Sequence, residues 1–329
     1  MIYRRMGKSG LKLSAFSYGS WLTFSNQMAL EPVKESLAMA YDHGVNFFDN
    51  AEVYANGKSE ELMGAAIHEL GWPRDSFCVS SKVFWGGSLP TQRGLSRKHI
   101  TDACHAALRR LQVDYLDLFF CHRPDNDTPV EETVRAMDAL VRQGKVLYWG
   151  TSEWDAVRIV EAFAVAEKYN LTPPSVEQPE YNMFHRHRIE VEYGRLFNEF
   201  GLGSTVWSPL ASGILTNKYA GGIPEESRAN LPGYEWLHER FRSEEGMRRI
   251  KTTAAMNEIA NRLNATMAQL ALAWCLANTN VSTVILGASK PSQLKENLGA
   301  LAVLDQLDAS VLDELEGILG NKPQPLPSF

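Results

Sequence analysis

Short hydrophobic runs recur along the chain, and each is followed by a turn and then by a stretch with helical spacing. Eight of these runs have the length and composition of buried parallel strands: residues 14–19, 45–49, 77–82, 116–122, 146–152, 175–178, 204–208 and 282–287. Amphipathic stretches between them predict helices, among them residues 31–43, 59–70, 97–111, 131–143, 154–169 and 186–200. This alternation predicts an α/β fold, a single (β/α)8 TIM barrel domain over residues 1–329.

Two segments fall outside the alternation. Residues 2–6 and 11–13, joined by the turn at residues 7–10, predict an N-terminal β-hairpin. Residues 209–246 are rich in Gly, Pro and Ser and predict a long loop after the seventh strand. Such a loop is either a functional lid or a decorative insertion. Because it leaves a strand end, we favour a lid that covers a cofactor.

Polar side chains stand at the ends of three hydrophobic runs. Asp49, Lys82 and His122 close their runs, and Tyr54 follows Asp49 by five positions. The carboxyl ends of the strands in a parallel barrel meet at one mouth, so we expect these side chains to converge there. A nearby ammonium lowers the pKa of a phenol, and a carboxylate keeps the ammonium charged. The set predicts proton transfer to a carbonyl, with hydride from a nicotinamide cofactor because no side chain supplies it.

Composition and charge narrow the class of protein. The chain has 44% hydrophobic and 22% charged residues and a net charge of −6, which is ordinary for a globular protein and disfavours nucleic-acid binding. The four cysteines stand far apart without a CxxC pair, as is typical of reduced thiols in a cytosolic protein. Neither a signal peptide nor a run of about 20 apolar residues is present, so we expect a cytoplasmic protein without membrane insertion.

Aromatic residues near the strand ends have two readings. Trp21 and Trp85 are either ordinary rim packing or, with Tyr54 and His122, the wall of an apolar substrate pocket; their position beside the strand exits favours the pocket.

Two further motifs carry less weight. His185 and His187 resemble a metal-binding pair, but no carboxylate pattern accompanies them, so we predict no metal site. Cys121 adjoins His122, yet neighbours on a strand point to opposite sides, so we expect its thiol to face away from the mouth.

Longer stretches of the chain resemble a known family. The resemblance is to the aldo-keto reductases, and most of all to the branch that contains the voltage-gated potassium-channel β subunits and their plant and microbial relatives. It is carried in order by FDNAEVYA at 48–55, KVFWGG at 82–87, GLSRKHI at 94–100, PVEETVRAM at 129–137, YWGTS at 148–152, EQPEY at 177–181, WSPLASG at 207–213 and LGAS at 286–289.

The resemblance implies roles for individual residues. Asp49, Tyr54, Lys82 and His122 would form a catalytic tetrad, with Tyr54 as general acid, in an NADPH-dependent reductase of aldehydes and ketones. Trp207 would stack on the nicotinamide, and Ser152 and Gln178 would bind its carboxamide. The implied NADPH/NADP+ contacts are completed by Ser20, Trp21, Gln27 and Asp49 near the first strands, by Ser208, Pro209, Leu210, Ser212 and Lys218 around the pyrophosphate, and by Arg228, Gly287, Ser289, Gln293, Glu296 and Asn297 toward the adenosine end.

Charge and motif content agree with this cofactor. Lys290, with Arg228, supplies positive charge that favours NADPH over NADH, and Pro291 predicts a helix start there. The chain has no G-x-G-x-x-G after a strand, so the barrel itself must bind the dinucleotide.

Two positions depart from the channel-subunit pattern. An asparagine stands in animal channel β subunits where this chain has His122, and this difference favours an enzyme. Glu153 stands where those subunits carry an arginine near the cofactor, a difference that bears on cofactor exchange. The alternative is an NADP(H)-sensing auxiliary subunit that docks on a cation channel and has weak reductase activity. The resemblance also implies a homotetramer.

Overall fold

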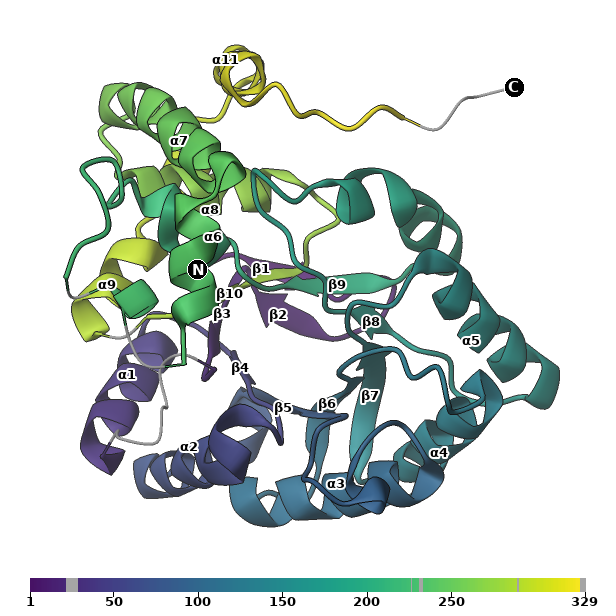
Figure 1. The fold of residues 1–329 in the computed structure, drawn as a ribbon. Helices are drawn as coiled ribbons and strands as arrows, with labels where there is room; N and C mark the ends of the chain where they lie inside the picture. Colours follow the sequence, from purple (N-terminus) through teal and green to yellow (C-terminus); the bar gives the residue numbers. More distant parts are fainter. Residues whose placement is uncertain (22–28, 226, 231–232, 289, 326–329) are drawn as a thin grey trace.

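Eight parallel strands close into a barrel within the described part of the chain (Figure 1). The computed structural model describes residues 1–21, 29–225, 227–230, 233–288 and 290–325. Neighbours around the barrel follow the order β10, β3, β4, β5, β6, β7, β8, β9. The strands are β3 (Phe16–Gly19), β4 (Phe47–Asp49), β5 (Cys78–Val83), β6 (Leu116–Cys121), β7 (Val146–Thr151), β8 (Val176–Glu177), β9 (Gly203–Val206) and β10 (Thr283–Leu286). Each lies within or next to a predicted run, so the predicted (β/α)8 barrel is confirmed.

The predicted hairpin is also present and lies at the end of the barrel where the strands begin. Strand β1 (Tyr3–Arg5) pairs antiparallel with β2 (Lys12–Ser14). Asn46, just before β4, exchanges two hydrogen bonds with Ser14, and Lys8 N donates to Gly201 O ahead of β9. These contacts hold the hairpin against the strand starts.

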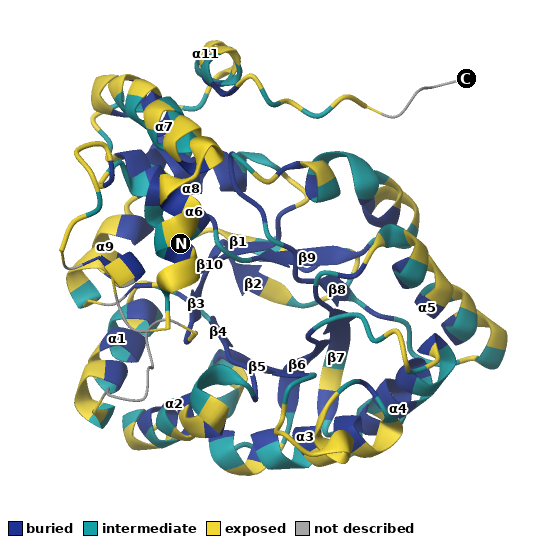
Figure 2. Cartoon of the chain, viewed as in Figure 1, coloured by how far each residue is buried: buried dark blue, intermediate teal, exposed yellow. Residues whose placement is uncertain are grey.

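Helices surround the barrel, with buried faces turned to the strands and exposed faces outward (Figure 2). Those that follow β3 to β7 are α1 (Leu30–Asp42), α2 (Lys58–Leu70), α3 (Arg97–Leu111), α4 (Val130–Arg142) and α5 (Ala156–Tyr169), each within two residues of its predicted bounds. Ser96 caps α3 by accepting a hydrogen bond from His99 N, as its sequence predicts. Shorter turns are η1 (Tyr54–Gly57), η2 (Arg74–Ser76) and η3 (Pro90–Gln92).

The second half of the chain differs from the prediction in two places. The helix expected over 186–200 is present as two short π-helices, η4 (Arg188–Glu192) and η5 (Leu196–Phe200), rather than as one α-helix. The loop expected over 209–246 contains η6 (Ala211–Thr216), η7 (Arg228–Asn230), α6 (Glu235–Arg242) and the start of α7 (Glu244–Arg262). The prediction that residues 209–246 form one loop without helices was therefore wrong. Helix α6 forms there because Leu237 and Phe241 recur at helical spacing and are buried.

The remaining helices complete the outer layer. They are α8 (Met267–Ala277), α9 (Pro291–Leu298), α10 (Leu301–Leu304) and α11 (Ala309–Leu319), and the segment after α11 leads away from the barrel (Figure 1). Helix α9 begins at Pro291, where a helix start was predicted. Among the helices in the described ranges, none has both the length and the hydrophobicity needed to cross a bilayer.

The barrel interior changes character along its axis. Toward the hairpin it holds an apolar cluster of buried side chains: Met6, Leu13, Phe47, Cys78, Leu118, Phe120 and Val176. Two residues further along three of these strands stand Asp49, His122 and Gln178, and Lys82 ends the inward series of β5. Because side chains alternate along a strand, each of these polar residues shares the inward face with an apolar one.

Candidate active site

Four predicted residues converge at the carboxyl ends of β4, β5 and β6. Asp49 ends β4, Lys82 is the penultimate residue of β5, His122 directly follows β6, and Tyr54 begins η1 in the loop after β4. Asp49, Lys82 and His122 are buried, and Tyr54 is half-buried. The expectation that these side chains meet at one mouth is confirmed.

A buried ion pair lies at the base of this group. Lys82 Nζ is 2.6 Å from Asp49 Oδ2 and donates a second hydrogen bond to Asn50 O at 2.7 Å. Ser80 Oγ and Gln178 Nε2 both donate to Asp49 Oδ1, at 2.8 and 3.1 Å. Burial is the largest single influence and would lower the pKa of Lys82, but the charges and hydrogen bonds of Asp49 and Tyr54 together outweigh it and the pKa is raised. The ammonium therefore stays charged.

The Tyr54 hydroxyl lies over this pair. Lys82 Nζ approaches Tyr54 Oη at 3.3 Å. Burial raises the pKa of the phenol, and the Lys82 charge opposes this rise without cancelling it. The lysine does stabilise phenolate, as expected, yet the expected net lowering of the pKa was wrong because desolvation outweighs the lysine. Tyr54 therefore keeps its proton at neutral pH.

His122 faces the phenol across the mouth. The centroids of the two rings are 5.9 Å apart, and the rings meet edge to face. Burial, together with the charges of Lys82 and Arg123, holds the pKa of His122 well below its ordinary value, so the imidazole is neutral. Its Nδ1 is buried and has no hydrogen-bond partner among the described residues.

Two predicted aromatic residues border these rings. The Trp85 ring centroid lies 5.1 Å from that of His122, and the Trp21 centroid lies 6.4 Å from that of Tyr54. Trp85 is half-buried, whereas Trp21 is 45% exposed. Both sides of the mouth are therefore aromatic, as an apolar substrate pocket requires.

The residues predicted to bind the nicotinamide carboxamide are adjacent. Ser152 Oγ donates to Gln178 O at 2.8 Å, and Gln178 reaches the tetrad through Asp49. Ser20 also joins the site, since its Oγ donates to Asp49 O at 3.0 Å.

Trp207 has a partner that the sequence did not suggest. Its indole Nε1 donates to Glu153 Oε1 at 3.0 Å, and the same carboxylate accepts from Glu180 N and pairs with Arg188 at 3.2 Å. Glu153 has a left-handed backbone, with φ 60°, which is uncommon for a residue with a side chain. The orientation of the indole is thus fixed by a charged hydrogen bond.

The chain after β9 forms a tight curl. Ser208, Ala211, Ser212 and Gly213 all have positive φ. A Cβ placed on Gly213 would lie 3.4 Å from Lys218 Nζ, so the ammonium stands directly over this backbone. Within the curl, Ala211 N donates to Ser208 O and Gly213 N donates to Leu210 O, so the backbone closes on itself and Lys218 supplies the positive charge beside it. Pro209 and Leu210 lie in the same curl.

The residues assigned to the adenosine end are less completely described. Gln293, Glu296 and Asn297 lie on α9, which packs against α1 and α8, and Gly287 follows β10. Gln27, Ser289 and the side chain of Arg228 lie outside the described part of the molecule.

Sequence reasoning missed three groups at the mouth. Ser80 is two residues before Lys82 on β5, so strand alternation already places it on the same face. The carbonyl of Asn50 was missed because backbone atoms leave no mark in a sequence. Arg123 was not identified as a site residue, although its guanidinium carbon lies 5.5 Å from the Trp85 centroid and 6.0 Å from that of Trp207.

Cys121 lies in the outer cluster, which packs against the helices, rather than in the interior one. The prediction that its thiol faces away from the mouth is confirmed. Burial raises its pKa well above the ordinary value, so it is not a thiolate.

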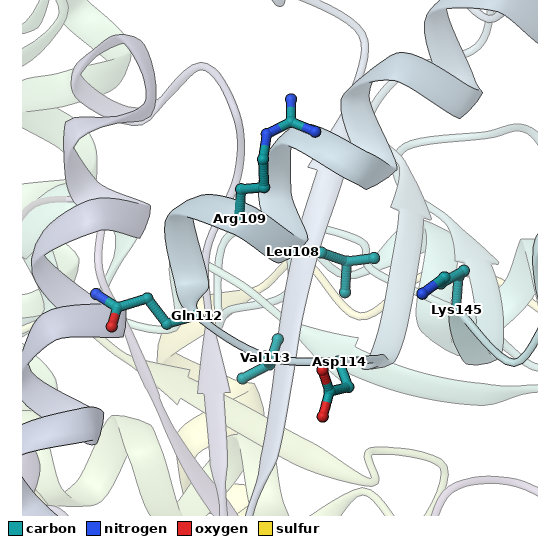
Figure 3. A pocket seen from close by; sticks show the side chains of 6 residues that line it. All are labelled: Leu108, Arg109, Gln112, Val113, Asp114 and Lys145. Carbon is teal, nitrogen blue, oxygen red and sulfur yellow. The ribbon is translucent and has the colours of Figure 1, made fainter.

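Two surface hollows lie at the opposite end of the barrel. One, of about 300 Å³, is lined by the end of α3, the turn before β6 and Lys145 (Figure 3). The other, of about 670 Å³, adjoins the hairpin and is lined by Arg4, Arg5 and Lys8, among others. Neither contains a tetrad residue. In the described ranges no group of three His, Cys, Asp or Glu residues is placed to hold a metal ion.

Comparison with known proteins agrees with this architecture. The model of the aldo/keto reductase family matches residues 15–319. The chain therefore belongs to the aldo/keto reductase family, whose members are oxidoreductases that generally use NAD(P)H. It is 50% identical over 330 residues to proteins from Arabidopsis thaliana and Oryza sativa subsp. japonica, each covered over its full length and each named a probable voltage-gated potassium channel subunit beta.

Proposed function

We propose that this protein is an NADPH-dependent reductase that interconverts aldehydes or ketones and alcohols, with Tyr54 as general acid. The observation that carries the proposal is the chain of contacts from Asp49 through Lys82 to the Tyr54 hydroxyl, opposite a neutral His122. A neutral imidazole donates a hydrogen bond without competing for the proton that Tyr54 supplies. His122 thus orients a carbonyl oxygen toward the phenol.

The roles within the tetrad follow from their electrostatics. When Tyr54 gives up its proton, the phenolate forms 3.3 Å from the Lys82 ammonium, which stabilises it. Asp49 keeps that ammonium charged and fixed in place. Lys82 therefore favours the transition state over the resting phenol.

The residues around the mouth fit a nicotinamide dinucleotide. When bound, NADPH would supply the hydride. Ser152 and Gln178 offer polar groups for its carboxamide, and Trp207 offers a fixed aromatic face. The Lys218 ammonium, which lies against the curl at Ser208 to Gly213, offers a positive charge for the pyrophosphate. The preference for NADPH over NADH remains a prediction, which rests on the positive charges of Lys290 and Arg228.

The Tyr54→Phe variant tests the proposal. We expect turnover of a small aromatic aldehyde to fall by about 10²–10⁴-fold, because the proton donor is lost. NADPH binding, followed by its fluorescence, should stay within about twofold, because the phenol is not among the proposed cofactor contacts. Tyr3→Phe, at a hydroxyl on the exposed hairpin, is the matched control. Retained turnover in Tyr54→Phe would remove Tyr54 from the acid role.

The names of the two plant relatives support a second candidate, an auxiliary subunit of a potassium channel. This function predicts tight NADPH binding, negligible turnover and co-purification with a channel from host membranes. The assembly implied by this branch is a homotetramer, which light scattering would test against the 36.8 kDa chain mass. His122 favours the enzyme over this alternative.

A further inference from the structure

Arg123 is a charged side chain at the mouth to which the proposed reductase mechanism assigns no part. It directly follows His122, is half-buried, and lies between the rings of Trp85 and Trp207. One guanidinium nitrogen, Nη1, donates to His122 O and to Ser152 Oγ. Nε and Nη2 have no hydrogen-bond acceptor among the residues that the structure describes.

The neighbouring carboxylates are committed elsewhere. Asp49 pairs with Lys82, and Glu153 pairs with Arg188 and accepts from Trp207. Asp125, two residues along from Arg123, accepts from Leu95 N, Asp127 N and Thr128 Oγ1. No carboxylate in the described ranges lies within ion-pair distance of Arg123; outside these ranges the acidic groups are Glu226 and the C-terminal carboxylate.

Among the described residues, the Asp49–Lys82 and Glu153–Arg188 pairs each cancel, whereas the guanidinium of Arg123 has no carboxylate partner. A partly buried cation normally has a counter-charge, because desolvation without one is costly. A guanidinium with two free donor positions matches the geometry of a carboxylate or a phosphate.

Resting on the proposed reductase function, we infer that the preferred substrates are carbonyl compounds that carry an anionic group, carboxylate or phosphate, a few bonds from the carbonyl carbon. The carbonyl oxygen lies between Tyr54 and His122, and the anionic group pairs with Arg123. The centroid of the Trp85 ring lies 5.1 Å from that of His122 and 5.5 Å from the guanidinium carbon of Arg123, so this ring borders both positions. The linker between the carbonyl and the anionic group is therefore short and packs on Trp85.

Matched substrates of different charge test the inference at saturating NADPH. Succinic semialdehyde is compared with butanal, and glycolaldehyde phosphate with glycolaldehyde; the second pair separates phosphate from carboxylate recognition. We expect the wild-type ratio of kcat/KM, anionic over neutral, to exceed about tenfold in at least one pair, as a charge-assisted hydrogen bond supplies. Arg123→Met should bring that ratio to about one or below, and Arg123→Lys should keep part of it.

The ratio is informative even if Arg123→Met loses activity in general, because a distorted site lowers kcat/KM for both substrates of a pair. Arg195→Met is the control, since Arg195 is an exposed arginine paired with Glu199 and its loss changes net charge equally. A wild-type ratio near one, or an unchanged ratio in Arg123→Met, would overturn the inference. An unchanged ratio with a large loss of NADPH affinity would assign Arg123 to the cofactor.

A binding measurement separates this inference from the proposed function. Benzoate and the neutral benzamide are titrated into the NADPH-loaded protein and followed by tryptophan fluorescence, since Trp85 and Trp207 flank Arg123. We expect benzoate to bind about tenfold or more tightly than benzamide, and this preference to disappear in Arg123→Met. If no aldehyde is reduced, the proposed function fails and this titration alone decides the inference. Equal binding of benzoate to wild type and Arg123→Met overturns it.

Discussion

The two ends of the barrel interior are built on the same strands from opposite kinds of side chain. Along β6, Leu118 and Phe120 face the apolar end and His122 follows at the mouth; along β5, Cys78 begins a series that ends in Lys82. Strand alternation keeps each series on one face. The apolar end therefore fixes the height and direction of the polar side chains above it.

The comparison also separates two kinds of energetic role. Burying apolar side chains at the hairpin end stabilises the fold and requires no partner of opposite charge. The buried ion pair at the mouth contributes little net stability, because desolvation offsets its attraction, but removing one partner leaves a bare buried charge. We expect substitutions at the mouth to affect turnover and stability separately, and those at the hairpin end to affect stability alone.

The largest effect is expected for Lys82→Met. Asp49 would keep its bonds from Ser80 and Gln178 but lose its counter-charge, so the free energy of unfolding should fall by about 3–5 kcal/mol. Turnover should fall at least about 100-fold, because phenolate at Tyr54 loses its stabilising charge. Urea unfolding and NADPH oxidation measure the two losses.

The double variant Asp49→Asn/Lys82→Met separates the loss of stability from the loss of turnover. It removes both charges, so most of the lost stability should return while turnover stays low. If stability does not recover, the loss in Lys82→Met comes from packing, and the distinction between the two ends of the interior fails.

An intermediate effect is expected for Leu118→Ala at the hairpin end. Leu118 is fully buried in the interior cluster, and its truncation should lower the free energy of unfolding by about 2–5 kcal/mol. Turnover per folded molecule should change less than about threefold, since the tetrad stands further along the strands. Leu89→Ala, at a leucine that is 59% exposed, is the control. A large loss of kcat in Leu118→Ala would show that the two ends are coupled.

The sequence predicts the barrel and the tetrad because both depend on local patterns. Apolar runs of strand length and a polar residue at each run's end are visible without any partner. Residues 235–242 were misread because Gly, Pro and Ser around them obscured the spacing of Leu237 and Phe241. Composition is a weaker guide than periodicity in such a segment.

Features that depend on side-chain packing were not predictable. The burial that raises the pKa of Tyr54, the bond from Trp207 to Glu153, and the place of Arg123 between two indole rings all join residues far apart in the chain. Glu153 was identified as a departure from the family pattern, but its left-handed backbone and its partners were not.

A second buried carboxyl sharpens the comparison by showing what a cation partner does. Glu177 lies on β8 between the inward-facing Val176 and Gln178, so its side chain points out of the barrel into the packed outer layer. Thr151 Oγ1 donates to its Oε2, and Oε1 has no hydrogen-bond partner among the described residues. Asp49 has Lys82 at 2.6 Å, whereas no ion pair forms at Glu177 in the described ranges.

The smallest effect is expected for Glu177→Gln and depends on pH. Burial raises the pKa of Glu177 from 4.5 to about 8, and the nearby charge of Glu153 adds to this. A folded-state pKa above the unfolded value gives stability that is complete below pH 4.5 and is lost as pH rises toward 8. The wild type should therefore lose about 2–3 kcal/mol between pH 6 and 9 that Glu177→Gln keeps. Urea unfolding at pH 6 and pH 9 measures this difference, and Glu161→Gln, at an exposed glutamate, is the control. If stability changes equally with pH in the wild type and in Glu177→Gln, Glu177 is already ionised at pH 6 and the prediction fails.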